Sequence, residues 1–307
     1  MALFSKTGIA ESRIENSGRW PVRLTRFQLI DEYEFPATNF PEIFFVEAGT
    51  FVHESEAGAQ SVREGAAVMA NPGHRHTVKR PDGVVLTRVR YLPEWFALDY
   101  ELVARSPDLL GLFFDQSWFR RPCDESIHVF TTRGENAARI RSELQYLQGL
   151  LREKRHFEPV VRVSMLKLLA LLADEHRRFW RGVPDLEILP EAAHALDHIE
   201  ACVHRGEPFT PGKMPRGGHE REAVEKAFGD LTGLSLADYA LRRRAFHAAF
   251  RLLTGREEPR RLAKVLGWSS PGELSEQFEA VFDLPPTVYR ERFGLSAAER
   301  KEEVEED

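Results

Sequence analysis

The 307-residue sequence has little cysteine: Cys123 and Cys202 are the only two. Two cysteines far apart form neither a disulfide framework nor a cysteine-rich metal site, which favours a reducing compartment. Long apolar runs are missing too, since no stretch approaches the roughly 18 residues of a membrane-spanning helix. The opening MALFSKTGIAESRIENSGRWP also lacks the apolar stretch of a signal peptide. We therefore expect a cytoplasmic protein that does not enter a membrane.

An excess of positive charge is absent as well. The chain carries 42 Lys and Arg against 48 Asp and Glu, for a net charge of −6. Such a chain is not attracted to nucleic acid as a whole, so any binding of DNA must come from a local basic patch. With 42% hydrophobic and 29% charged residues, the composition is that of a folded protein, and the length suffices for about two domains.

Residues 22–91 have the pattern of short strands. Runs of β-branched and aromatic residues alternate with turn-like segments, and no helical pattern comes between them. The runs are VRLTRFQLIDEYEF, EIFFVEAGTFVHES, AAVMANPGHRHTV and GVVLTRVRYL, and the turns are EAGAQ, NPGHR and RPDG. Strands at this spacing predict an antiparallel barrel or sandwich. The following PDLLGLFFDQSWF predicts short helix.

From Gly134 onward the apolar residues recur with a helical period. The segment ENAARIRSELQYLQGLLREKR has one stripe, formed by Ile140, Leu144, Leu147 and Leu151. The next segment, EPVVRVSMLKLLALLADEHRRFW, is apolar over much of its circumference, with Met165, Leu166, Leu169 and Leu172 suited to a bundle seam. Apolar surface of this kind predicts dimerisation, although an intramolecular core has the same pattern.

Residues 217–289 contain an internal repeat with an offset of 50 residues. The matching pairs are Val224 and Leu274, Phe228 and Phe278, Leu234 and Leu284, Tyr239 and Tyr289, and Gly217 and Gly267. Each copy has the pattern of a helix-turn-helix unit, and LADYALRRRAFHAAFRLL predicts a long helix between them. In the second copy, Ser270 is predicted to cap a helix over 271–282, with Glu273 closing a capping box.

The first copy has lost its supporting helix. The second copy has PRRLAKVLG at this place, whereas the first has TPGKMPRGG. Two prolines and three glycines within nine residues do not sustain a regular helix.

The C-terminal hundred residues resemble those of AraC-type transcription regulators. The resemblance rests on RLAKVLGWSSPGELSEQFEAVFDLPPTVYR, on Gly233 to Tyr239, and on Arg244, Ala248 and Leu252. More weakly, the N-terminal region resembles the cupin-type sensor domain of the same family, through Glu42, Gly49, Gly65 and NPGHRH.

This resemblance implies an α+β fold with an N-terminal cupin-like β-barrel, an all-α segment and a C-terminal AraC-type double helix-turn-helix domain. The expected parts are a sensor domain at 20–125, a helical dimerisation segment at 135–182, a helix-turn-helix domain at 191–296 and an acidic tail at 297–307. It also implies a transcription regulator rather than an enzyme, without a cofactor. Its expected partners are DNA, a small-molecule effector, a second copy of the chain and RNA polymerase.

The candidate DNA-binding residues lie in and around the second helix-turn-helix unit. They are Arg260, Arg261, Lys264, Ser269, Ser270, Ser275, Glu276, Gln277, Arg290 and Arg292. Basic residues flanking the helix would contact phosphate, and Gln277 would read adenine. Glu276 and Glu279 stand where the family usually has basic residues, and residues 191–300 hold sixteen Lys and Arg against seventeen Asp and Glu. The run at 242–244 is expected to be a solvated basic face.

The candidate effector-binding residues are Glu42, His74 and His76. NPGHRH resembles the second cupin motif, in which His76 would be a metal ligand, but the accompanying His-x-His is missing before Glu42. We therefore expect no metal. Alternation along the strands does not decide whether His53 faces inward. Two alternatives remain: a regulator-like protein that has lost DNA binding and acts through protein contacts, and a metal-dependent cupin enzyme.

Overall fold

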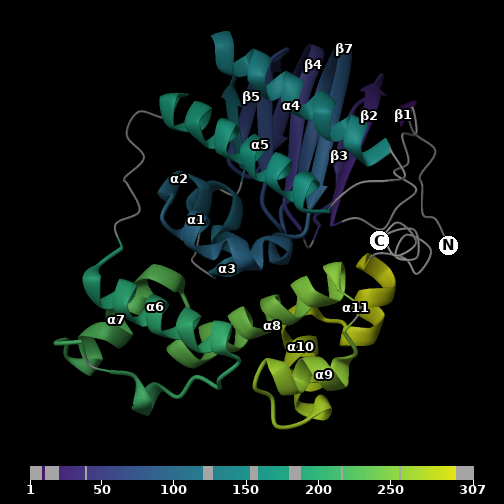
Figure 1. The fold of residues 1–307 in the computed structure, drawn as a ribbon. Coiled ribbons are helices and arrows are strands. Elements are labelled where there is room, and N and C mark those ends of the chain that lie inside the picture. Colours follow the sequence, from purple (N-terminus) through teal and green to yellow (C-terminus); the bar gives the residue numbers. More distant parts are fainter. Residues whose placement is uncertain are drawn as a thin grey trace. The chain divides into compact units, whose positions relative to one another are not determined.

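The structure is a computed structural model that describes residues 9–10, 21–38, 40–119, 127–152, 158–179, 188–215, 217–255 and 257–294. The acidic tail predicted at 297–307 lies outside them. The chain divides into two compact units (Figure 1). Apart from short N-terminal pieces, the first unit comprises residues 22–92 and 123–183, and the second comprises residues 93–122 and 184–307. A sheet followed by helices confirms the predicted α+β fold class.

The first unit is built on an antiparallel sheet of eight strands in the order β1-β2-β7-β4-β6-β8, with β3 on β7 and β5 on β4. The strands are β1 (Ile9–Ala10), β2 (Val22–Leu29), β3 (Tyr33–Phe35), β4 (Glu42–Ser55), β5 (Gly58–Arg63), β6 (Ala66–Ala70), β7 (His76–Tyr91) and β8 (Ile127–Thr131). The predicted turns at EAGAQ and NPGHR separate β4 from β5 and β6 from β7.

The sheet has two halves, one containing β6 and the other containing β5, and the long strands β4 and β7 run through both. Residues 42–45 of β4 pair with β6 and with the end of β7, whereas residues 50–55 pair with β5 and with the beginning of β7. The register between β4 and β7 shifts at three places between Val46 and Val52. Such bulges bend a strand and increase its twist, so the sheet folds over on itself.

The folded sheet encloses one apolar core, as in an open barrel. Its members come from both halves: Phe27, Leu29, Phe35, Phe44, Val46, Phe51, Val62, Ala66, Val68, Ala70, Val78, Val84, Leu86, Ile127 and Val129. The predicted turn RPDG is wrong, because these residues lie inside β7. Arg80 and Gly83 take left-handed backbone conformations, with φ of 50° and 60°. The strand therefore bends there and continues in the sheet.

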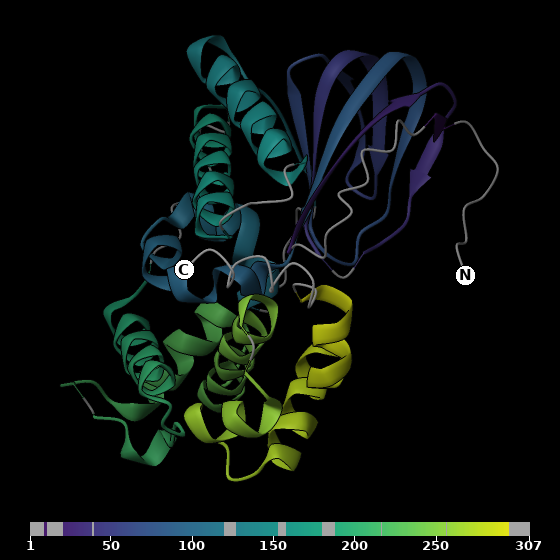
Figure 2. The same cartoon turned by 45° about the vertical axis from the view of Figure 1, so that its right-hand side comes forward.

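Helices α4 (Gly134–Arg152) and α5 (Glu158–Phe179) follow the sheet and lie on one side of it (Figures 1 and 2). The predicted stripe of α4 is buried: Ile140, Leu144, Leu147 and Leu151. The residues of α5 that suit a bundle seam are also buried within the single chain: Met165, Leu166, Leu169 and Leu172. Their apolar surface is therefore used in the intramolecular core.

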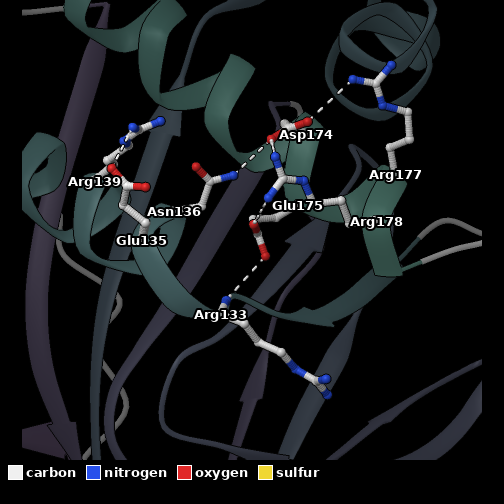
Figure 3. Close-up of polar contacts among 8 residues, drawn as sticks. All are labelled: Arg133, Glu135, Asn136, Arg139, Asp174, Glu175, Arg177 and Arg178. Carbon is white, nitrogen blue, oxygen red and sulfur yellow. Dashed lines mark hydrogen bonds and ion pairs between the residues drawn. The ribbon is translucent and has the colours of Figure 1, made fainter.

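Polar contacts join the beginning of α4 to the end of α5 (Figure 3). Asn136 donates a hydrogen bond of 2.8 Å to the Asp174 carboxylate, which also pairs with Arg178 at 2.7 Å. The neighbouring Glu175 accepts a 3.2 Å hydrogen bond from the backbone N–H of Arg133. These contacts hold the two helices together as an antiparallel pair.

The described elements of the second unit are all helical. They are η1 (Pro93–Asp99), α1 (Tyr100–Ala104), α2 (Pro107–Leu109), η2 (Leu110–Phe114), α3 (Asp115–Trp118), α6 (Pro190–Arg205), η3 (Pro211–Lys213), α7 (Arg221–Thr232), α8 (Leu236–Thr254), α9 (Pro259–Val265), α10 (Pro271–Phe282) and α11 (Pro286–Phe293). Residues 93–119, which fall in the predicted sensor domain, belong to this unit. None of the described helices is long and apolar enough to cross a membrane.

The internal repeat is visible in the backbone. Helices α7 and α10 begin and end 50 residues apart, as 221–232 and 271–282. Each ends at a residue with left-handed backbone, Gly233 with φ 67° and Asp283 with φ 55°. The supporting helix of the second copy is α9, whereas the first copy has the three-residue turn η3 in its place. The predicted loss of this helix is confirmed.

Two glycines bring the end of α6 against the turn of the second helix-turn-helix unit. A Cβ atom built on Gly267 would lie 2.3 Å from the carbonyl oxygen of Gly206, and Gly267 has φ +78°. A Cβ atom on Gly206 would lie 2.0 Å from the carbonyl oxygen of Val265. Only glycine fits this close backbone approach.

We predict that Gly267→Ala lowers the free energy of unfolding by at least about 1–3 kcal/mol, because the new methyl group meets fixed backbone and the left-handed conformation is strained. Urea unfolding followed by circular dichroism measures the change. Gly272→Ala is the control, since its Cβ would meet only the Ser270 side chain at 3.7 Å. Equal stability of Gly267→Ala and the parent protein would contradict the close approach.

Candidate functional site

The start of α10 is fixed by its own polar side chains. The Ser270 hydroxyl accepts a 3.1 Å hydrogen bond from the backbone N–H of Glu273, as an N-cap does. The Glu273 carboxylate accepts from the hydroxyl and the backbone N–H of Ser269, at 2.5 and 2.8 Å. These hydrogen bonds lower the pKa of Glu273. Glu273 thus closes the predicted capping box one residue earlier than expected and stabilises the helix start.

Gln277, the predicted reader of adenine, is engaged within the protein. Its side-chain oxygen accepts hydrogen bonds from the Trp268 indole at 2.7 Å and from the Arg244 guanidinium at 3.0 Å. Its amide nitrogen donates to Glu273 at 3.1 Å. A contact between Gln277 and a base would have to use the remaining amide hydrogen or break these bonds.

The basic residues predicted to flank α10 differ in whether their side chains already have partners within the protein. Arg260, Arg261 and Lys264 are exposed on α9, and their side chains make no ion pair within the described part of the chain. In contrast, the Arg290 side chain is 23% exposed and donates to the Glu257 carbonyl at 3.3 Å and to Glu258 at 3.4 Å. Three of the five predicted phosphate contacts are therefore exposed cations on α9, whereas Arg290 is used to hold α11 against the residues before α9.

The remaining predicted positions lie on α10 and α11. Ser275 is half-buried, whereas Glu276 and Glu279 are exposed. Arg292 is exposed, and its guanidinium lies 5.2 Å from the centre of the Phe293 ring. The outward face of α10 therefore remains acidic.

The expectation of a solvated basic face at 242–244 is wrong. Arg242 donates a 2.7 Å hydrogen bond to the carbonyl of Ser117. Arg244 lies over the Trp268 ring at 4.5 Å and donates to the carbonyl of Gly267 at 3.1 Å. The run therefore joins α8 to other parts of the second unit.

The middle arginine of that run is fully buried. Arg243 is 0% exposed and donates to both oxygens of Glu200, at 2.6 and 3.0 Å, and to the carbonyl of Ala97 at 3.0 Å. The rings of Tyr100 and Trp118 lie 4.6 and 4.8 Å from its guanidinium carbon. A buried charge requires such partners, and these come from α6 and from residues 93–118.

Glu200 also belongs to a group of side chains that could hold a metal ion. Its ligand atoms and those of His204 and His247 lie within 4.8 Å of one another. Both Glu200 oxygens, however, already accept from Arg243, whose positive charge opposes a cation at the same place. The arrangement fits a buried ion pair better than a metal centre.

The barrel interior holds a second polar group. The imidazoles of His53 and His76 are 1% and 3% exposed, and His53 Nε2 lies 3.0 Å from His76 Nδ1. His76 is stacked on the Phe35 ring at 4.8 Å. Glu42 is also buried, 3.9 Å from the Arg90 guanidinium. Burial raises the pKa of the Glu42 carboxyl.

The structure thus buries two of the three predicted effector residues and adds others. His74 lies half-buried in the turn before β7. His53 faces inward, which strand alternation did not decide because bulges interrupt β4. Arg88 was also missed; its guanidinium lies 5.5 Å from the centre of the Phe27 ring. The sequence pattern that could have identified Arg88 is its alternation with Val84 and Leu86, which places all three on one face of β7.

A metal ion of the kind that cupin motifs bind does not fit these residues. A metal needs at least three protein ligands that converge on one point. The facing nitrogens of His53 and His76 are at hydrogen-bond distance from each other, and no third ligand completes a group with them among the described residues. Burial lowers the pKa of His53 to about 4 and that of His76 to about 3, so both rings are neutral near pH 7.

No protein-family model and no curated protein matches this chain. Among solved structures, ToxT from Vibrio cholerae O395, bound to (E)-4-(8-methylnaphthalen-1-yl)but-3-enoic acid, is similar with a TM-score of 0.43 and 10% identity, over 94% of this chain and 100% of that chain. The AraC-like transcriptional activator CuxR is similar with a TM-score of 0.39 and 13% identity, over 76% and 80% of the two chains. The C-terminal domain of AraT, a response regulator from Geobacillus stearothermophilus, has a TM-score of 0.34 and 17% identity, over 36% and 92%.

We predict that the buried histidine pair makes stability depend on pH. Its folded-state pKa values of about 4 and 3 lie below the ordinary 6.5, so the unfolded state binds more protons as the pH falls. This stability is complete above about pH 6.5 and decreases below it, by up to about 1.4 kcal/mol per pH unit for one histidine. The double variant His53→Gln/His76→Gln should unfold in urea with a weaker pH dependence between pH 7 and pH 5. His74→Gln is the control, and an unchanged dependence in the double variant would refute the assignment.

We also predict that Arg243→Met destabilises the second unit by about 3–5 kcal/mol, because it leaves the Glu200 carboxylate buried without its partner. Glu200→Gln/Arg243→Met should lose less, since the uncompensated charge is then absent. Urea unfolding of the three proteins measures both effects. Arg139→Met is the matched control: it removes an exposed pair with Glu135 worth at most about 1 kcal/mol. A loss no larger than that of the control would contradict the burial of the pair.

Proposed function

We propose that this protein is a DNA-binding transcription regulator of AraC type. The observation that carries the proposal is the complete second helix-turn-helix unit, in which α9 presents Arg260, Arg261 and Lys264 to solvent beside α10. Cations at this place suit phosphate contacts, which position a helix on DNA. The first copy lacks its supporting helix, and its α7 cations Arg221 and Lys226 pair with acidic residues of the same helix. In this proposal the first copy of the repeat therefore contributes little to DNA binding.

In this proposal the barrel is the sensor and takes a small-molecule effector without a metal. Glu42 and His76 are joined there by His53 and Arg88, whereas His74 is at the edge of the site. The aromatic surroundings and the two neutral imidazoles favour an effector with an apolar body and a few polar groups.

A homodimer through α4 and α5 is part of the same proposal, as is contact with RNA polymerase. The leucines of α5 are buried in the chain itself, so the apolar surface for a partner comes from other residues. Tyr146, Val160 and Val163 are 52%, 38% and 61% exposed. Exposed apolar residues on neighbouring helices suit an isologous contact between two copies.

A second candidate is a regulator that acts through protein contacts alone. It is favoured by the acidic outward face of α10, where Glu276 and Glu279 oppose phosphate, and by the internal engagement of Gln277 and Arg290. Both candidates are non-enzymatic. Binding of DNA distinguishes them.

Because three cations are free on α9, we predict a slope of log K against log salt of about −2.7 per protomer, at roughly −0.9 for each phosphate contact. Fluorescence anisotropy with a labelled duplex over a salt series measures this slope. Replacing Arg260, Arg261 and Lys264 by Ala should remove most of it, and Glu276→Lys/Glu279→Lys should steepen it.

The charge-matched control is Glu54→Lys/Glu56→Lys, which changes two exposed residues of the first unit. It should leave the slope nearly unchanged. Absence of DNA binding by the parent protein at low salt, together with strong binding by Glu276→Lys/Glu279→Lys, would reject DNA binding as its function and favour the second candidate.

A further inference from the structure

A hollow of about 340 Å³ lies in the first unit between the outer face of the sheet and α4. Its apolar lining comes from Leu24 on β2, Phe45 and Val46 on β4, and Leu144 on α4. Its volume is within the range of small-molecule pockets. The barrel core is on the opposite face of the sheet, since Phe44, the neighbour of Phe45, belongs to that core, whereas Val46 beside the bulge borders both.

One wall of this hollow is formed at a β-bulge. Val46 pairs with Leu86 and Ala48 pairs with Val85, so Glu47 is the extra residue of β4. The Glu47 carboxylate accepts a 2.6 Å hydrogen bond from Arg26 and a second one from the Thr87 hydroxyl. A bulge turns a side chain away from the regular pleat, and bulges are common beside functional sites. Here the bulge brings a compensated carboxylate to the wall of a pocket.

The opposite wall comes from α4. Arg141, Gln145 and Gln148 follow each other at helical spacing and line the hollow together with Leu144. The turn between β5 and β6 adds Glu64 to the lining. Within the described residues, the side chains of Arg141 and Glu64 are exposed and have neither an ion pair nor a hydrogen bond. Glu47, in contrast, is already bound to Arg26.

The lining therefore leaves one cation and one anion uncommitted, on different walls, above an apolar floor. We propose that the hollow binds a small zwitterion of amino-acid type with an apolar side chain. Arg141 receives the carboxylate, for which a guanidinium offers two parallel donors. Glu64 receives the ammonium group, and the apolar side chain packs on Leu24, Phe45 and Leu144.

The charges decide between this ligand and simpler ones. A plain carboxylate would pair with Arg141 but leave Glu64 facing it without a partner, and a plain amine would do the reverse. A neutral apolar molecule would leave both charges and the two glutamine amides unused. A ligand with both charges pairs with both residues at once. The inference does not rest on DNA binding, because it concerns the first unit alone.

The test uses the full-length protein and each standard L-amino acid at millimolar concentration. Thermal unfolding should show a higher Tm with at least one apolar amino acid, because a ligand that binds only the folded state stabilises it. Isothermal titration then compares L-leucine with L-leucinamide, which lacks the carboxylate, and with 4-methylpentanoate, which lacks the ammonium group. Each analogue should bind at least about tenfold more weakly, equivalent to about 1.4 kcal/mol.

Two substitutions locate the site. Arg141→Gln should abolish the preference for L-leucine over L-leucinamide, and Glu64→Gln should abolish the preference for L-leucine over 4-methylpentanoate. Arg139→Gln is the control on the same helix, since Arg139 pairs with Glu135 instead. A Tm unchanged by every amino acid overturns the proposal. So does equal binding of L-leucine and either analogue, or equal loss of binding in Arg139→Gln and Arg141→Gln.

Discussion

The ion pair between Arg243 and Glu200 is the contact on which the second unit depends. Both charges are removed from water, which is costly unless every partner is in place. The partners come from three parts of the chain: α6 supplies the carboxylate, α8 the guanidinium, and residues 93–118 a carbonyl and two aromatic faces. Displacing any of these would leave a buried charge uncompensated. The pair therefore fixes how the three parts pack against one another.

The same chemistry explains why the helix-turn-helix domain has few free cations. Arg242, Arg243, Arg244 and Arg290 all donate to carbonyl or side-chain oxygens within the unit. A guanidinium can join several backbone and side-chain acceptors at once, so arginine serves as a structural residue here. Among the described residues, the α9 cations Arg260, Arg261 and Lys264 remain exposed without an ion pair, as do Lys213 and Arg292.

Much of the fold was predictable because local patterns and tertiary packing agree. The repeat at an offset of 50 residues predicted the matching ends of α7 and α10, and the clustered prolines and glycines predicted the missing supporting helix. The turn at 80–83 was predicted wrongly because the pairing of β7 with β4 keeps these residues in the sheet. The roles of Arg243 and His53 depend on partners more than twenty residues away, which periodicity does not reveal.

The histidine pair in the barrel presents the same two kinds of hydrogen-bonding group to its surroundings in either tautomer. Two neutral imidazoles carry two N–H groups on four nitrogens, and one N–H is used in the bond between His53 Nε2 and His76 Nδ1. If His53 donates, its Nδ1 is an acceptor and His76 Nε2 is a donor; if His76 donates, these roles are exchanged. Whichever tautomer is present, the outer nitrogens provide one donor and one acceptor. The pair can thus meet a group of either polarity without a charge in the core, provided that an outside group takes a proton from one outer nitrogen and another gives a proton to the opposite one as the shared proton moves.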